Sequence, residues 1–205
     1  MHFIKAKVSK IILALTSVGI VILLMFPASL SASHYRYGNM SWSLDNQTTI
    51  RIKLKAGFRT NYDSFLGTVG QTKSGWVSIN WGDGTSNDTP LVKTSSVVAD
   101  GSSLVEVGAN IDGAWVAGVA HTYADNGTYI VSWTDGNRIT NIHNIPSSSG
   151  KGWRLESKVT IGGIHAGNVS PVSSVPPVVQ VQDNTTDNFT YQVSATDANS
   201  GDNIH

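Results

Sequence analysis

The sequence predicts an all-β sandwich that follows an N-terminal signal helix. Three observations carry this prediction. After residue 30 no stretch has helical periodicity, the apolar residues alternate with polar ones, and the short apolar runs are separated by Gly, Asn and Asp. Alternation with a period of two is typical of half-buried strands. Many short strands separated by turn residues are typical of a β-sandwich.

Residues 1–33 have the pattern of a secretory signal peptide. A basic region with Lys5, Lys7 and Lys10 precedes an apolar run over residues 11–26, and small residues follow as a cleavage region. An uncleaved membrane anchor is the alternative, but this run is shorter than the roughly 20 residues that span a bilayer. We therefore expect a secreted or cell-envelope protein that meets a membrane only through this segment.

Charge and cysteine content narrow the class of protein. Three of the 14 basic residues and none of the 14 acidic residues lie in the predicted signal, so the mature chain has 11 basic residues, 14 acidic residues and a net charge of −3. Phosphate binding needs clustered basic residues, and no run of like charges is present, so we expect no nucleic-acid partner. The chain has no cysteine, and its fold must depend on core packing without disulfides.

The first two strands form a predicted hairpin over residues 37–56. Asp45, Asn46 and Gln47 supply turn chemistry between two alternating runs. The apolar positions of the two runs are Met40, Trp42 and Leu44, and then Ile50, Ile52 and Leu54.

Later segments add further strands. Candidates lie before the Gly-Asp-Gly turn that starts at Gly82, at 104–107, at 115–119 and at 128–133, and residues 153–161 suggest a final pair of short strands. The segment 86–120 is too apolar for a flexible loop, so we expect it to contribute strands.

A proline-rich run marks the clearest domain boundary. Residues 171–177 read Pro-Val-Ser-Ser-Val-Pro-Pro, which predicts an extended, stiff linker. Two more strand candidates, 178–181 and 189–195, follow it, and two strands cannot enclose a core. We expect residues 34–170 to form one domain, 178–205 to begin a second, truncated domain, and the chain to be an N-terminal fragment.

Two segments resemble the halves of a polycystic-kidney-disease (PKD) repeat. The first reads Val-Ser-Ile-Asn-Trp-Gly-Asp-Gly-Thr over 77–85, and the second reads His-Thr-Tyr and Gly-Thr-Tyr-Ile-Val within 121–131. The resemblance implies an immunoglobulin-like β-sandwich, here elaborated by the hairpin at 34–55 and the long insertion 86–120. The residues that carry the signature are Trp81, Gly82, Asp83, Gly84, His121, Tyr123, Gly127 and Tyr129.

The residue types suit that signature. A tryptophan on a central strand fills space between sheets, glycines permit positive φ in a tight turn, and an aspartate accepts backbone hydrogen bonds there. We expect Trp81 and Tyr129 to lie back to back in the core, and Tyr123 to anchor its loop through its hydroxyl as a tyrosine corner does.

The last residues resemble the start of a cadherin-like or immunoglobulin-like repeat. Residues 191–197 read Tyr-Gln-Val-Ser-Ala-Thr-Asp, and Asn199, Gly201 and Asp202 follow. Asp197, Asn199 and Asp202 bring three oxygen-bearing side chains together, and calcium takes six to eight oxygen ligands. Two interpretations stand, a calcium site that stiffens a domain junction and an acidic turn without metal. We favour the turn because a full ligand set is not visible, and no other cofactor is expected.

No motif for a nucleophile or a carboxylate pair is present, so the sequence predicts a protein that is not an enzyme. We expect an adhesive, spacing or binding module whose partner is a protein or a glycan at the cell surface. The alternative is the substrate-binding accessory region of a secreted hydrolase whose catalytic domain lies downstream.

Two further features bear on binding. Of the six tryptophans, we expect four or more in the core, which leaves one or two for a sugar ring. The chain also carries Asn-X-Ser/Thr sequons, the acceptors of N-linked glycans. They begin at Asn39, Asn46, Asn87, Asn126, Asn168, Asn184 and Asn188.

Overall fold

A computed structural model describes residues 34–62, 66–97, 101–142, 144–163, 167–173 and 194–199. All of these belong to one compact unit, Ala32–His205. The predicted signal peptide, the strand candidate 178–181 and most of 189–195 lie outside the described residues, as do residues 174–177 of the predicted linker.

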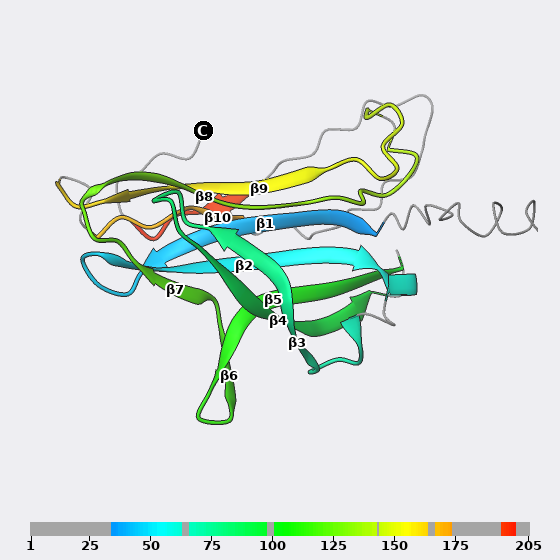
Figure 1. Ribbon diagram of the computed structural model, residues 1–205, viewed down its shortest axis with the longest axis horizontal. Helices are drawn as coiled ribbons and strands as arrows, with labels where there is room; N and C mark the ends of the chain where they lie inside the picture. Colours follow the sequence, from blue (N-terminus) through cyan, green and yellow to red (C-terminus); the bar gives the residue numbers. More distant parts are fainter. Residues whose placement is uncertain are drawn as a thin grey trace, which may run out of the picture. The chain divides into compact units, whose positions relative to one another are not determined.

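The described part of the chain is almost entirely β-structure, which confirms the all-β prediction. One large antiparallel sheet runs in the order β1-β2-β5-β4-β3-β8-β9, with β6 added to β5 and β7 added to β2 (Figure 1). Its strands are β1 (Tyr35–Leu44), β2 (Thr49–Arg59), β3 (Thr72–Asn80), β4 (Ser86–Val97), β5 (Ser102–Ile111), β6 (Ala114–Ala117), β7 (Val119–Thr122), β8 (Gly127–Asp135) and β9 (Trp153–Ile161). A two-stranded sheet pairs β10 (Val172–Ser173) with β11 (Ala195–Thr196), and a 3-10 turn, η1, spans Thr60–Tyr62.

The large sheet folds over into a nearly closed sandwich. Its two edge strands, β1 and β9, lie close to each other, and a parallel bridge joins Tyr35 to Arg138 beyond the end of β8. The core between the layers holds one aromatic group around Tyr35, which stacks on Trp153 at 3.8 Å between ring centroids. A second aromatic group surrounds Trp81.

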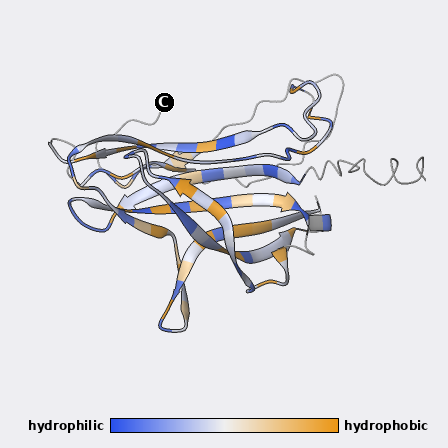
Figure 2. Cartoon of the chain, in the orientation of Figure 1, coloured by the Kyte–Doolittle hydropathy of each residue, from blue (hydrophilic) through white to orange (hydrophobic). Residues whose placement is uncertain are grey.

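The alternation predicted for the first hairpin is confirmed. Ile50, Ile52 and Leu54 on β2 are buried, whereas Lys53 and Lys55 between and after them are exposed. Figure 2 shows this alternation of apolar and polar residues along the strands. One face of β2 therefore stabilises the sandwich by hydrophobic burial, at about 1.5–3 kcal/mol for each large side chain.

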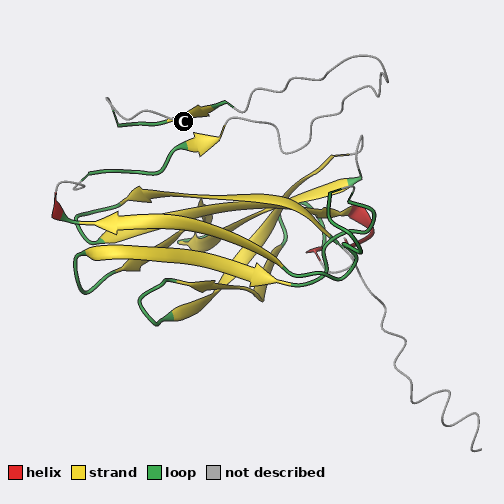
Figure 3. Cartoon of the chain, turned by 90° about the horizontal axis from the view of Figure 1, so that it is seen from above, coloured by secondary structure: helices red, strands yellow, loops and turns green. Residues whose placement is uncertain are grey.

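The hairpin formed by residues 108–118 leaves the body of the sheet. β2 pairs with β7 over Thr49–Ile52 and with β5 over Lys55–Arg59. Between β5 and β7 the chain turns out through Asp112 and Gly113, both with positive φ, as a two-residue hairpin turn requires. The 108–118 hairpin projects away from the remaining strands in Figure 1. Seen from above, the body consists of strands, and short helical pieces lie only at its ends (Figure 3).

Of the predictions for the later strands, the one for 86–120 is confirmed and the one for 153–161 is wrong. The segment 86–120 does supply strands, namely β4, β5, β6 and the first residues of β7. The prediction of two short strands over 153–161 is wrong, because Trp153–Ile161 pairs with β8 along its whole length as a single strand. Inward and outward positions alternate along this whole strand, and the polar residues Glu156 and Lys158 at its centre occupy outward positions.

Candidate functional site

The Gly-Asp-Gly turn after β3 is held by hydrogen bonds to the Asp83 side chain and by a backbone bond between Trp81 and Thr85. Its Oδ1 accepts the backbone N–H of Thr85 at 2.9 Å and the hydroxyl of Thr85 at 2.7 Å. The N–H of Trp81 donates to the carbonyl of Thr85 at 3.0 Å. These bonds close a turn in which Gly82 and Gly84 both adopt positive φ, a conformation that side chains disfavour.

Gly82 has a second reason to be glycine. A Cβ at this position would meet the backbone N and O of Ile130 at 2.7 Å each. The turn therefore lies directly against the backbone of β8, and no side chain fits between them. This contact joins the two segments that carry the signature.

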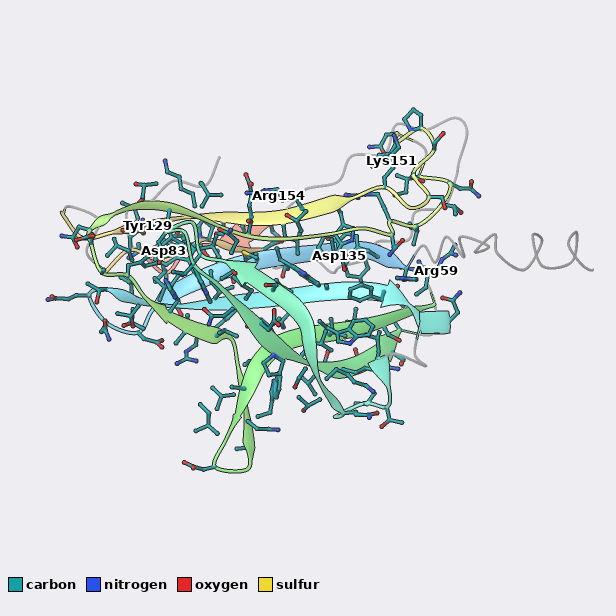
Figure 4. The ribbon with its side chains drawn as sticks, viewed as in Figure 1. Arg59, Asp83, Tyr129, Asp135, Lys151 and Arg154 are labelled. Atoms are coloured by element: carbon teal, nitrogen blue, oxygen red, sulfur yellow. The ribbon has the colours of Figure 1, made fainter. Side chains whose placement is uncertain are left out.

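Four aromatic rings connect the turn to β8. Trp81 stacks on His121 at 4.4 Å between centroids, and His121 meets Tyr123 edge to face at 4.7 Å. Tyr123 in turn stacks on Tyr129 at 3.9 Å. Asp83 and Tyr129, at the two sides of this group, lie at the same end of the sheet in Figure 4. We call Trp81, Asp83, His121, Tyr123 and Tyr129 the signature cluster.

Polar atoms in and around the signature cluster are paired. The buried Tyr123 hydroxyl donates to the carbonyl of Trp81 at 3.0 Å. It therefore bonds the turn after β3, whereas the hydroxyl of a tyrosine corner bonds backbone only a few residues upstream. Burial, with smaller contributions from Asp83 and Tyr129, raises the pKa of Tyr123. The Tyr129 hydroxyl donates to the carbonyl of Asp125 at 2.8 Å.

Asp83 is the electrostatic centre of the signature cluster. Its Oδ2 lies 2.7 Å from Nε2 of His121. Desolvation alone would raise the pKa of Asp83, but the two hydrogen bonds from Thr85, and then the hydrogen bond and the electrostatic attraction of His121, outweigh it and lower this pKa to about 2. The carboxylate therefore stays charged and ties the turn to β7.

This arrangement suits a structural clasp better than a catalytic site. An imidazole that serves as a general base must present a free nitrogen to a nucleophile or a substrate. Here Nε2 pairs with Asp83, so Nδ1 is the nitrogen left to act as a base, and the ring that carries it packs against Trp81 and Tyr123 with 14% of the side chain exposed. The nearest hydroxyl to the carboxylate, that of Thr85, donates to Asp83.

The structure brings the predicted signature residues together, with one correction. Gly127 begins β8, and a Cβ there would lie 3.3 Å from the Tyr129 hydroxyl. The prediction that Trp81 and Tyr129 lie back to back is wrong, because Trp81 stacks on His121 and Tyr129 stacks on Tyr123. Tyr123 is almost fully buried, whereas Tyr129 is only half-buried.

Sequence reasoning missed two polar partners of the signature cluster. Asn87 accepts the indole N–H of Trp81 at 2.8 Å, and Asn80 accepts the N–H of Gly82 at 2.9 Å. The signal for Asn80 was available, because an asparagine two residues before a turn glycine commonly bonds its backbone. Asn87 carried no such signal, since its role depends on the pairing of Ile79 with Asn87 across β3 and β4.

The candidate calcium residues are only partly within the described ranges. Oδ1 of Asp197 accepts the N–H of Asn199 at 2.8 Å. The carboxamide of Asn199 donates to the carbonyl of Gly167 at 3.0 Å and accepts the N–H of Val169 at 2.9 Å. Asp202 lies outside the described residues. Among the described residues no group of three or more His, Cys, Asp or Glu side chains could hold a metal ion.

The prediction that four or more tryptophans are buried is confirmed. The other two indoles, those of Trp76 and Trp115, are half-buried. The buried ones are Trp42, Trp81, Trp133 and Trp153.

Comparison with known proteins identifies a family and one relative. The family described as "Integrin beta-like protein A-E, N-terminal" matches residues 36–162, which contain the whole signature cluster. The "Integrin beta-like protein B" of Dictyostelium discoideum is 27% identical over 190 residues, covering 87% of this chain and 9% of the relative. The chain thus spans less than a tenth of that relative. No solved structure matches. No helix in the described part of the chain is long and apolar enough to cross a membrane.

Proposed function

The chain belongs to the integrin beta-like protein A-E N-terminal family, and from that membership we propose that it is a non-catalytic, extracellular adhesion module. The relative from Dictyostelium discoideum is named as integrin beta-like. The clasp-like use of Asp83 and His121 supports a scaffold role, because the acid–imidazole pair is used within the fold. The likeness of the signature cluster to a PKD repeat fits the same role.

The proposal extends to the domain plan. Residues 34–170 act as the first module, 171–177 as its linker and 178–205 as the start of the next module, after a signal peptide at 1–33. A calcium ion at Asp197, Asn199 and Asp202 is not part of this proposal, because the carboxamide of Asn199 already bonds Gly167 and Val169. Nothing in the described residues favours the role of a hydrolase accessory region.

The projecting 108–118 hairpin carries the proposed binding surface, and one observation supports this choice. Within the described ranges, β6 pairs with β5 alone. The pair next to the turn is Ile111 and Ala114. In an antiparallel ladder every second pair exchanges backbone hydrogen bonds, so the pairs two and four residues further from the turn are hydrogen-bonded as this closing pair is. The bond from the N–H of Gly118 to the carbonyl of Val107 fits this series.

This register turns the backbone groups of Trp115 and Ala117 outward. They form an edge that an extended segment of a partner protein could extend by strand addition. Natural edges are commonly protected by charges or proline, yet β6 reads Ala-Trp-Val-Ala. On β6 itself Ala114 and Ala117 are exposed, and Trp115 and Val116 are half-buried. The edge thus offers main-chain hydrogen bonds together with apolar contact.

The substitution Ala117→Lys tests this surface. Beads coated with the full chain are applied to living cells of the organism that produces the protein, and retained beads are counted. A lysine on the outward edge blocks strand addition, so we expect retention to fall about tenfold, which corresponds to about 1.4 kcal/mol.

Thr134→Lys is the matched control. It places the same charge at an exposed strand position on β8, and we expect it to retain as many beads as the unaltered chain. Equal loss in both variants would point to non-specific charge effects and contradict the β6 surface. No retention by the unaltered chain would contradict the adhesion role itself.

A further inference from the structure

Asn46 stands out among the sequon asparagines because of how its carboxamide is held. It lies in the turn between β1 and β2, where Asp45, Asn46 and Gln47 are all exposed. Its Oδ1 accepts the N–H of Thr48 at 3.1 Å and the N–H of Thr49 at 2.8 Å. The oxygen therefore faces the backbone of the turn, and Nδ2, on the other side of the planar group, faces away from it.

The turn that holds this carboxamide is itself rigidly bonded. The backbone N–H groups of Asp45 and Asn46 both donate to the carbonyl of Thr49, at 2.8 and 3.2 Å. Arg51 forms an ion pair with Asp45 at 2.6 Å. The N–H of Tyr123 donates to the carbonyl of Thr48 at 3.0 Å. A group attached to Nδ2 thus meets solvent without disturbing a bond of the fold.

The other described sequons are less well placed. All three terminal atoms of the Asn126 carboxamide lie within 2.5 Å of the position of a Cβ on Gly162, so its nitrogen packs on the end of β9. Asn87 lies within β4 opposite Ile79 and not in a turn, and Pro90 directly follows its sequon. Asn168 is half-buried and precedes Pro171. Asn39 is exposed, but it lies within β1 opposite Lys55 and not in a turn.

We propose that Asn46 carries an N-linked glycan. The co-reactant is an oligosaccharide linked to a polyprenyl diphosphate. A bond forms between Nδ2 of Asn46 and C1 of the first sugar, the bond from C1 to the phosphate oxygen breaks, and Nδ2 loses one proton. The polyprenyl diphosphate leaves with the bonding electron pair. Oδ1 remains an acceptor, so both backbone hydrogen bonds of the turn are kept. This inference rests on the proposed extracellular role.

The test uses the full chain with its own N-terminal segment, produced in a eukaryotic host that has the glycosyl transferase. The intact mass, and the mass of the peptide that contains position 46, are measured on protein from the medium and from the cell, before and after treatment with peptide N-glycosidase in ¹⁸O water. We expect secreted protein whose released glycan leaves ¹⁸O-labelled aspartate at position 46. Asn46→Gln and Thr48→Ala should each lack one glycan, because both destroy the sequon.

Thr48→Ser is the matched control, because it keeps the sequon and should keep the glycan. Asn126→Gln should leave the mass of attached sugar unchanged. Secreted protein without sugar at position 46 would overturn the glycan site and leave the extracellular role intact. Protein confined to the cytosol, with its N-terminal segment uncut and no sugar, would overturn both.

Discussion

At the scale of single residues, substitutions of Gly82 and Gly84 distinguish the cost of a positive φ from the cost of a steric clash with β8. Both have positive φ, but an added Cβ meets the backbone of Ile130 at Gly82 and nothing within 4 Å at Gly84. Gly84→Ala should cost about 1–2 kcal/mol of unfolding free energy, the strain of positive φ. Gly82→Ala should cost about 1–3 kcal/mol more, because β8 must move. Urea denaturation measures both, and equal costs would contradict the contact between turn and strand.

The carboxylate of Asp83 predicts a pH dependence. Its pKa in the fold is about 2, below the ordinary value of 3.8. The charged form is therefore favoured by folding, and its stabilisation is present above about pH 4 and lost as the pH falls towards about 2. Asp83→Asn should lower the stability at neutral pH and flatten the decline between pH 4 and 2.

Denaturation curves at a series of pH values check this prediction. Asp112→Asn, at the exposed tip of the 108–118 hairpin, removes one acidic charge without touching the signature cluster. It should leave the decline as steep as in the unaltered chain. An unchanged slope in Asp83→Asn would show that the pairing with Thr85 and His121 does not contribute to acid stability.

At the scale of elements, the sequence predicted those strands whose inward positions are apolar. The first hairpin was predicted closely because Ile50, Ile52 and Leu54 alternate with charged residues. β4 was not located, since its first residues, Ser86 to Asp88, are exposed and polar and pair with β3 only through the backbone. Backbone pairing leaves no signal in side-chain type.

The sequence predicted which residues form the signature cluster, but it did not predict how their rings are arranged. The resemblance identified the residues that meet, but which ring stacks on which depends on the register between distant strands. His121 reaches Trp81 and Asp83 because β7 pairs with the start of β2. The projecting hairpin was missed for a related reason. Asp112-Gly113 is a turn signal, but no residue pattern indicates that the flanking strands leave the sheet.

At the scale of the described molecule, the segment after β9 connects the sandwich to the residues beyond the predicted linker. Ser170 bonds β1 at Trp42, because its Oγ accepts the N–H of Trp42 at 2.7 Å and its own N–H donates to the carbonyl of Trp42 at 3.1 Å. Asn199 then bonds Gly167 and Val169. This continuous set of bonds predicts a stiff junction, with no need for metal.

Asn199→Ala tests that junction. Loss of the carboxamide removes both of its bonds to 167–169 and leaves the Val169 N–H with Oδ1 of Asn168 at 2.9 Å as its acceptor. Amide hydrogen exchange at Val169 should therefore become faster by about two- to fivefold, which corresponds to about 0.4–1 kcal/mol. Exchange in β2 should not change, because its amides are protected by the core. Asp197→Asn is the control, since an asparagine oxygen still accepts the N–H of Asn199.

If added calcium slowed exchange in the unaltered chain but not in Asp197→Asn, the metal interpretation would replace the hydrogen-bonded junction. If calcium had no effect and Asn199→Ala alone exchanged faster, the direct bonds would account for the stiffness.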